Sequence, residues 1–208
     1  MAIIATNSGS SRELIPANNY LARCYQMIEI GTVKESILGK EVIAHKVRIG
    51  WELPTELKVF NPEKGEQPCV ISKEYTLSMN EKANLRKMLA SWRSADFTEE
   101  QAKAFDITKL LGVPCMINII HKPSKDGSKV YEEIAGVTAV PKGITVPVQI
   151  TPTFCLSYDQ FDGNAFNSLP DFIKNKMMTS LEYAKIADPN STHFDNPNTN
   201  EVEDDLPF

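Results

Sequence analysis

Basic and aromatic residues at strand spacing are the side chains of this 208-residue chain most suited to chemistry. Arg23 and Tyr25 lie two positions apart in one stretch of alternating apolar and polar residues, and Lys46 and Arg48 do so in a second. Residues two apart on a strand project from the same face, so each pair would present both side chains together. Cationic groups hold phosphates and aromatic rings stack on bases, so these pairs indicate a surface for single-stranded nucleic acid.

Two loops and a third strand enlarge this set. Lys34 and Lys40 lie between the first two expected strands, and three more lysines flank the turn at residues 126–127. Trp51 lies on the apolar face of its strand, where core packing is favoured over base stacking. Tyr25 fits ordinary half-exposure equally well. The candidate DNA-binding residues are Arg23, Tyr25, Lys34, Lys40, Lys46, Arg48, Trp51, Lys73, Tyr75, Lys122, Lys125 and Lys129.

Residue patterns that support catalysis or cofactor binding do not occur in the sequence. His45, His121 and His193 stand alone, and neither a phosphate-binding glycine loop nor an H-E-x-x-H motif is found. The four cysteines are widely spaced, which favours reduced thiols packed as small hydrophobes over a zinc site or disulfides. We therefore expect a non-enzymatic binding protein without a metal or another cofactor.

Alternating apolar residues define the strands that must position these side chains. Residues 20–30 predict a first strand and residues 41–53 predict a second. The apolar face of the first would hold Ala22, Cys24, Ile28 and Ile30, and that of the second Val47, Ile49, Trp51 and Leu53.

The order of the expected elements predicts the fold class. A third strand covers residues 69–77, a helix follows the capping-box pattern of residues 78–81, and two strands follow at 115–120 and 130–140. A second short helix would start at Thr98. This order is that of an OB-fold, a small barrel with its helix between the third and fourth strands, although another α+β sandwich would give the same order. We predict a mainly β OB-fold barrel over residues 18–143.

The flanking segments differ from this central domain in composition. Residues 1–17 predict a flexible N-terminal arm. Residues 144–187 predict an extension with a helix at about 169–186, which would pack on the barrel or on a second subunit of a homo-oligomer. Residues 188–208 hold six acidic residues and no Lys or Arg, which predicts a disordered acidic tail. The rest of the chain then has 21 acidic and 22 basic residues, so the net charge of −5 still permits a basic groove.

The last five residues could themselves be a ligand. Asp204 and Asp205 precede Leu206, Pro207 and Phe208. An apolar ring beside carboxylates fits a small hydrophobic pocket rimmed by Arg or Lys on a partner protein. We therefore expect these five residues to bind a partner, the alternative being a disordered tail with an aromatic residue by chance.

The sequence also resembles known families. Residues 204–208 are similar to the acidic C-terminal tip of bacterial single-stranded DNA-binding proteins, which ends Asp-Asp-Ile-Pro-Phe, with Leu206 in place of Ile. Residues 19–25, 30–32, 47–54, 110–112, 115–121, 169–170 and 180–183 resemble bacteriophage proteins predicted to bind single-stranded DNA, a similarity that spans about residues 18–186. The resemblance implies a protein that protects single-stranded DNA in replication, recombination or repair. It also implies that the tip recruits replication or recombination proteins and competes with DNA for the basic groove.

An alternative function uses the same elements differently. A phage structural or assembly protein could use the β-barrel for oligomerisation and its tail for docking on a scaffold. Such a module would have no need of the loop lysines or the basic strand face. The longest apolar runs fall short of the ~18 residues of a membrane helix, so we expect a cytoplasmic protein, in the bacterial host if it is phage-encoded.

Overall fold

The computed structural model describes residues 13–37, 40–124 and 126–188, apart from the side chain of Ile37. The strands are β1 (Asn18–Ile37), β2 (Lys40–Asn61), β3 (Gly65–Thr76), β4 (Pro114–Pro123), β5 (Val130–Thr138) and β6 (Phe154–Leu156). The helices are α1 (Asn84–Arg93), α2 (Glu99–Lys103), α3 (Gly163–Asn167), α4 (Asp171–Met178) and α5 (Leu181–Ala187). Two 3-10 turns, η1 (Pro62–Lys64) and η2 (Ile107–Leu110), complete the elements.

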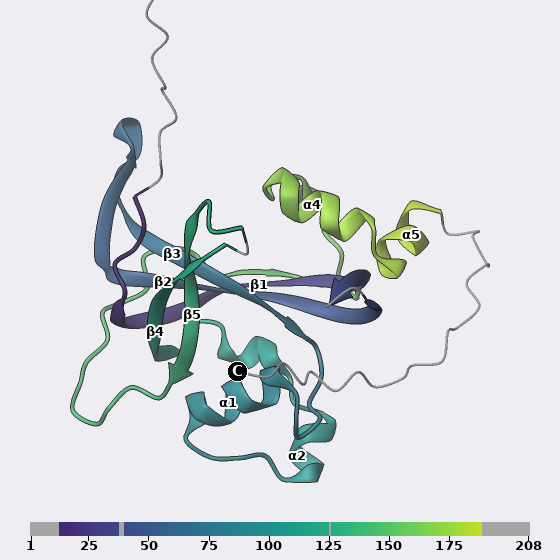
Figure 1. Cartoon of the computed structure of the whole chain (residues 1–208), viewed down its shortest axis with the longest axis horizontal. Coiled ribbons are helices and arrows are strands. Elements are labelled where there is room, and N and C mark those ends of the chain that lie inside the picture. The colour runs from purple at the N-terminus through teal and green to yellow at the C-terminus, as the bar shows by residue number, and fades with distance from the viewer. Residues whose placement is uncertain (1–12, 38–39, 125, 189–208) are drawn as a thin grey trace, which may run out of the picture.

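The five long strands form one strongly curled antiparallel sheet in the order β3-β2-β1-β4-β5, so the protein is mainly β with helices (Figure 1). β4 pairs with β1 only over Asn18 to Arg23, and β6 takes its place beside Gln26 to Ile28 in parallel orientation. The curl brings the two edge strands together, because Lys73 of β3 donates to the carbonyl of Ile134 on β5 at 2.8 Å. The sheet is therefore a half-barrel whose open side is bridged by one lysine.

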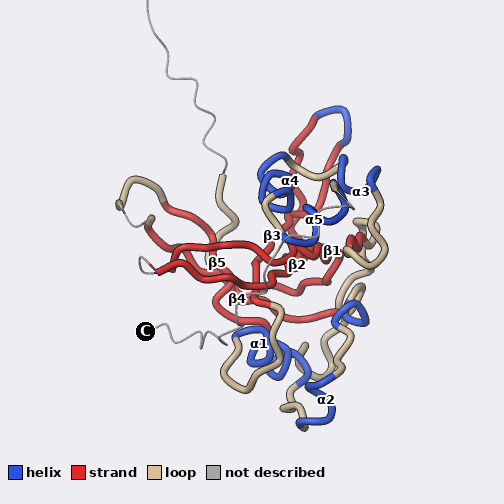
Figure 2. Tube along the Cα trace, turned by 90° about the vertical axis from the view of Figure 1, so that its right-hand side faces the viewer, coloured by secondary structure: helices blue, strands red, loops and turns tan. Residues whose placement is uncertain are grey.

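The two faces of the sheet are covered by different helices. Figures 1 and 2 both place the sheet between α1 on one side and α4 on the other. α1 covers the concave face, and its buried residues Leu85, Met88, Leu89 and Trp92 join the larger hydrophobic cluster. We call these the inner face and the inner cluster, and the side under α4 the outer face.

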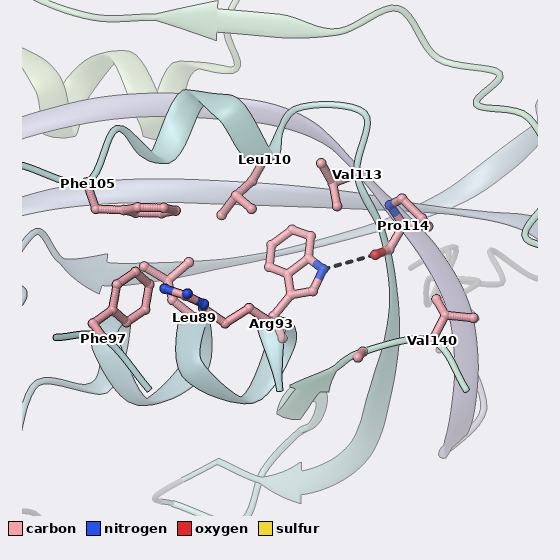
Figure 3. Close-up of a pocket in the computed structure, with 10 residues that line it drawn as sticks. Leu89, Arg93, Phe97, Phe105, Leu110, Val113, Pro114 and Val140 are labelled. Carbon is pink, nitrogen blue, oxygen red and sulfur yellow. Dashed lines mark hydrogen bonds between the residues drawn. The ribbon is translucent and has the colours of Figure 1, made fainter. Parts of the chain in front are cut away.

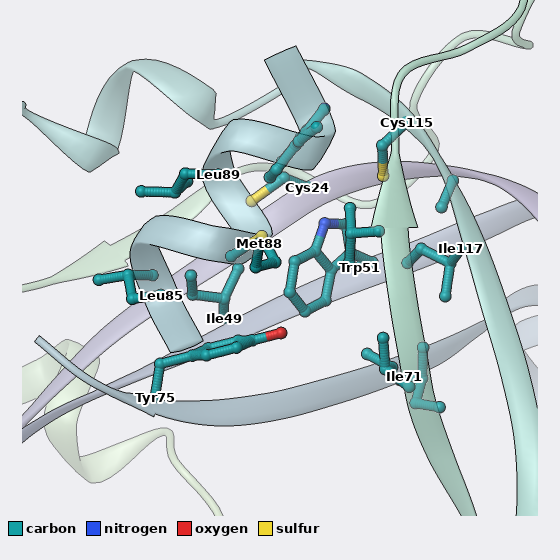
Figure 4. Packing of buried hydrophobic residues seen from close by; sticks show 14 of the residues in the cluster. Cys24, Ile49, Trp51, Ile71, Tyr75, Leu85, Met88, Leu89, Cys115 and Ile117 are labelled. Atoms are coloured by element: carbon teal, nitrogen blue, oxygen red, sulfur yellow. The ribbon is translucent and has the colours of Figure 1, made fainter. Parts of the chain in front are cut away.

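The inner cluster confirms the alternation predicted for the second strand. Val47, Ile49, Trp51 and Leu53 of β2 are all buried there, and Figure 4 shows Trp51 enclosed between α1 and the strands. The rings of Trp51 and Trp92 lie 6.1 Å apart between centroids. Ile15 also enters this cluster at 2% exposure, so residues 13–17 are tied to the domain, contrary to the flexible arm expected there.

The alternation predicted for the first strand is wrong after Cys24. The pairing of β1 with β2 shifts register between Cys24 and Gln26, and a β-bulge of this kind reverses the faces of the residues that follow. Ala22 and Cys24 face the inner cluster, whereas Ile28 and Ile30 belong to a second cluster on the outer face.

The second cluster is formed by the segment after the half-barrel. Residues 154–187, which we call the C-terminal module, comprise β6, α3, α4 and α5. Phe166, Leu169, Ile173 and Met177 of this module pack on Ile28, Ile30 and Val33 of β1. The module therefore docks on its own sheet, in line with one of the two arrangements expected for it.

Two helix boundaries differ from the prediction. The capping-box pattern at residues 78–81 forms turns, and α1 begins only at Asn84. The helix expected at about 169–186 is split in two, because Ser180 accepts a hydrogen bond from the amide of Tyr183 and so caps a new helix, α5. The short helix predicted to start at Thr98 is confirmed: Thr98 is the N-cap of α2 and forms a capping box with Gln101. No helix in the described part of the chain has the length and apolar character to span a membrane.

Candidate nucleic-acid interface

An exposed aromatic ring lies over an arginine on the outer face of the sheet. Arg48 alternates with the buried residues of β2 and so projects outward. Phe172 of α4 lies over it, with the guanidinium carbon 5.3 Å from the ring centroid. Phe172 is 61% exposed, so the rest of its ring faces solvent. We call Tyr25, Arg48, Gly50, Ser72 and Phe172 the outer strand site.

Tyr25 completes the site from β1. Its ring lies against Gly50 of β2, where an added Cβ would stand 3.2 Å from the Tyr25 ring. The absence of a side chain at Gly50 therefore lets this half-buried ring lie on the strand. Burial raises the pKa of Tyr25, while the nearby Arg48 charge opposes that change. The phenol is accordingly neutral at physiological pH.

A chain of alternating charges runs beside this site. Lys46 contacts Glu35 at 2.8 Å, Glu35 contacts Lys176 of α4 at 2.6 Å, and Lys176 contacts Glu74 at 2.6 Å. Glu74 then reaches Arg48 at 3.3 Å. Three cations against two carboxylates leave one positive charge in this charge chain. Burial works to raise the pKa of Glu35, but hydrogen bonds from Lys176 and Lys46 outweigh it and lower the pKa.

Arg48 is held at the end of the charge chain by two hydrogen bonds from its terminal nitrogens. Its Nη2 donates to Ser72 of β3, and its Nη1 to Glu74. Its buried Nε finds no acceptor among the residues that the structure describes. A buried donor without a partner is costly, so this atom would gain from a hydrogen bond to a ligand oxygen.

Arg23 has a structural role in place of the predicted DNA contact. Its guanidinium donates to the carbonyls of Pro147, Gly112 and Val146 at 2.6, 2.8 and 3.2 Å. The fully buried carboxylate of Glu52 accepts the amides of residues 150 and 151 at 2.7 Å each. These bonds fasten residues 146–151 across β1 and β2, and those of Arg23 use three of the five N–H groups of its guanidinium.

Trp51 and Tyr75 are also buried, so the prediction that they contact DNA is not supported by their positions. Trp51 is 0% exposed and Tyr75 is 6% exposed, both within the inner cluster. A base cannot reach either ring face, so neither ring stacks on DNA in this conformation. Burial also raises the pKa of Tyr75 far above its ordinary value.

Two further lysines share one carboxylate at the open side of the half-barrel. Glu133 of β5 lies 2.8 Å from Lys122 and 3.5 Å from Lys73. Burial favours the neutral form of Glu133, but the two lysines lower its pKa overall. The pairing leaves one net positive charge near the turn of the β4–β5 hairpin.

The remaining predicted lysines lie at or beside the hairpin turns: Lys34 is in β1, Lys40 begins β2 and Lys129 directly precedes β5. Lys34, Lys40 and Lys129 are exposed, and no carboxylate within the described ranges pairs with them. Lys125 lies outside the described residues, as do Asp204, Asp205, Leu206, Pro207 and Phe208. The structure therefore brings Tyr25, Lys46 and Arg48 together on one face, with the loop lysines at the ends of the strands.

Phe172 is the residue that sequence reasoning missed. It precedes Ile173 and so lies off the buried stripe that Ile173 and Met177 form on α4. An aromatic residue off the buried stripe of an amphipathic helix is a signal of surface function, and it could have been noticed.

Comparison with known proteins identifies no family for this chain. No family model matches the chain, and no curated protein and no solved structure is significantly similar to it. Within the part of the chain that the structure describes, no group of three or more His, Cys, Asp or Glu side chains is placed to hold a metal ion.

Proposed function

We propose that this protein binds single-stranded DNA through the outer strand site. The observation that carries the proposal is the solvent-facing ring of Phe172 lying over Arg48 on the outer face. An exposed ring backed by a cation is the arrangement on which bases stack without regard to sequence. Tyr25 supplies a second aromatic surface on the same face.

We further infer that the half-barrel is an OB-fold. Three features support this inference: the strand order β3-β2-β1-β4-β5, the approach of β3 to β5 through Lys73, and the position of α1 between β3 and β4. OB-folds bind oligonucleotides on the face of their second and third strands and with the loops β1–β2 and β4–β5. Arg48 and Ser72 lie on those strands, and Lys40 and Lys129 lie in or beside those loops.

Phosphates would be held by cations that are now paired. A DNA phosphate can replace Glu35 or Glu74 as the partner of Lys46, Arg48 or Lys176, since the charge chain carries one more cation than anions. The exposed lysines of the two loops would extend the track. Each phosphate contact releases counterions, so affinity would fall steeply with salt, by a log–log slope of roughly 0.7 per contact for a single strand.

The 204–208 segment is the proposed attachment point for other proteins. Its acidic and apolar residues suit a partner pocket with a basic rim. The protein would then protect single-stranded DNA in replication, recombination or repair and bring partner enzymes to it, with no catalysis of its own.

Fluorescence anisotropy with a labelled oligo-dT tests the proposal. We expect Phe172→Ala to weaken binding about 5- to 150-fold, since a stacked base contributes roughly 1–3 kcal/mol. Phe60→Ala is the matched control, because Phe60 is 56% exposed but lies near the β2–β3 turn, away from α4. The proposal fails if the wild-type protein does not bind oligo-dT at low salt or binds duplex DNA equally well. Equal losses of affinity in the two variants would show that Phe172 makes no specific contact with the DNA.

A further inference from the structure

A small apolar pocket lies beside α1, on the side of the sheet opposite the outer strand site. Its volume is about 260 Å³, and Leu89, Trp92, Phe97, Phe105, Leu110 and Val140 are among the residues that line it (Figure 3). The indole nitrogen of Trp92 donates to the carbonyl of Pro114 at 3.0 Å, as the dashed line shows. Because this hydrogen bond already uses the indole N–H, the surface that Trp92 contributes to the pocket is apolar.

Arg93 is the one charged side chain in the lining of this pocket. Its guanidinium carbon lies 4.4 Å from the ring centroid of Phe97, which positions the cation at the rim. No carboxylate among the described residues lies within ion-pairing distance of Arg93, which is exposed. The nearby Asp96 accepts the amide of Phe97 and contacts Arg86, while the charge of Arg93 acts on it only from beyond ion-pairing distance. The pocket thus combines an apolar interior with a cation available for an acidic ligand.

We propose that the 203–208 segment of this chain docks in the Arg93 pocket. Glu203, Asp204 and Asp205 directly precede Leu206 and Phe208, so the segment joins apolar side chains to carboxylates. The ring of Phe208 would fill the pocket, and the aspartates would face Arg93. Aromatic side chains bury a large apolar area in such a pocket, and charge pairing at the rim sets the direction of entry.

The connecting chain is long enough for this contact. The 20 Cα–Cα steps from Asp188 to Phe208 span at most roughly 72 Å when extended. A folded domain of this size has a radius of gyration of about 16 Å, so its width is smaller than that span. Residues 188–208 also lack Lys and Arg, so no cation within the segment competes with Arg93 for its carboxylates.

The docked segment would be withheld from partner proteins. A partner that recruits residues 204–208 must first displace them from the Arg93 pocket, which makes recruitment a competition. The pocket lies near α1 and the outer strand site near α4, so docking leaves the proposed DNA face open. This inference is independent of DNA binding and is tested without DNA.

Methyl NMR of the full-length protein tests the docking. Phe208→Ala should shift the methyl signals of Leu89, Leu110 and Val140, which line the pocket. Phe194→Ala is the matched control in the same acidic segment and should leave those signals unchanged. Arg93→Gln should move the Leu110 and Val140 signals toward their positions in Phe208→Ala.

Two results would overturn the inference. Identical pocket signals in wild type and Phe208→Ala would show that the ring does not enter the pocket. Differences that disappear on tenfold dilution would exclude docking within one chain, because an intrachain contact does not depend on protein concentration.

Discussion

The two faces of β1 and β2 are covered by contrasting chemistry. On the inner face, Trp51 and its neighbours pack against α1 in a continuous apolar cluster. On the outer face, the C-terminal module buries a smaller cluster and adds ionic contacts, among them Lys176 with Glu35 and Glu74. Burial of apolar area responds little to pH, whereas ion pairs respond to pH and salt. The contrast indicates that the half-barrel is held together by apolar packing, whereas the attachment of the C-terminal module responds to pH and salt.

The largest expected effect tests the inner face. Trp51→Ala should lower the free energy of unfolding by about 3–5 kcal/mol, because it leaves a cavity at the centre of the inner cluster. Urea denaturation measures this loss. A loss below about 1 kcal/mol would show that Trp51 does not hold the half-barrel together.

The next largest effect tests whether the C-terminal module unfolds separately from the half-barrel. Met177→Ala removes a fully buried side chain of the outer cluster and should cost about 2–5 kcal/mol. The loss should appear as faster amide exchange in α4 and α5, with β2 and β3 still protected. The adjacent Met178→Ala is the control, since Met178 is exposed. Equal acceleration in β2 and β3 would mean that the two faces unfold as one unit.

A smaller effect concerns the fit of α5 against β1. Gly31 has φ +90°, and a Cβ there would lie 2.6 Å from a carboxylate oxygen of Glu182 and 2.7 Å from the Cβ of Ser180. Gly31→Ala should therefore cost more than the roughly 1–2 kcal/mol of left-handed strain alone. Gly143→Ala isolates that strain, because Gly143 has φ +86° and no atom within 4 Å of the added Cβ. Equal thermal destabilisation of the two variants would contradict the close approach of α5.

The smallest expected effect is a pH dependence of the stability with which the C-terminal module is attached to the sheet. His45 contacts Glu29 at 2.8 Å and Glu182 of α5 at 3.6 Å, and Thr32 donates to Glu182. The hydrogen bond to Glu29 raises the pKa of His45 above 6.5, and the same bond lowers the pKa of Glu29 below 4.5. Burial alone would raise the pKa of Glu182, but the bonds from Thr32 lower it overall.

The sign of each shift fixes the pH window. Since the pKa of His45 is raised on folding, its contribution is complete below about pH 6.5 and is lost as pH rises through the raised pKa. Since the pKa values of the two glutamates are lowered, their contributions are complete above about pH 4.5 and are lost as pH falls. Amide exchange in α5, corrected for its intrinsic rate, should be slowest between these limits. His45→Gln should abolish the alkaline change, and an unaltered alkaline change in that variant would exclude His45 as its source.

Local patterns in the sequence predicted much of the half-barrel. The alternation of Val47, Ile49, Trp51 and Leu53 is a period-two signal in a strand with one buried face, and it holds in the structure. The bulge after Cys24 inserts one residue and leaves no such signal, so the faces of Ile28 and Ile30 were wrongly assigned. The split between α4 and α5 depends on one serine that could equally have lain within a longer helix.

The site was less predictable because its partners are distant in sequence. Lys46 and Arg48 were placed on the correct polar face, but their pairing depends on Glu35, Glu74 and Lys176, which come from two other strands and a helix. Arg23 has the residue type of a phosphate ligand, and only the crossing of residues 146–151 shows that two of its donors are occupied there. Phe172 is distant from Arg48 in sequence, and only the position of α4 on the sheet brings its ring over the guanidinium.

Photo-crosslinking of oligo-dT to the full-length protein tests the central claim most directly. Ultraviolet light joins thymine to residues in direct contact, and mass spectrometry locates the modified peptides. We expect crosslinks at Tyr25 and Phe172 on the outer face, diminished at high salt and absent with duplex DNA. Crosslinks confined to peptides away from β1–β3 and α4, or none at low salt, would contradict it.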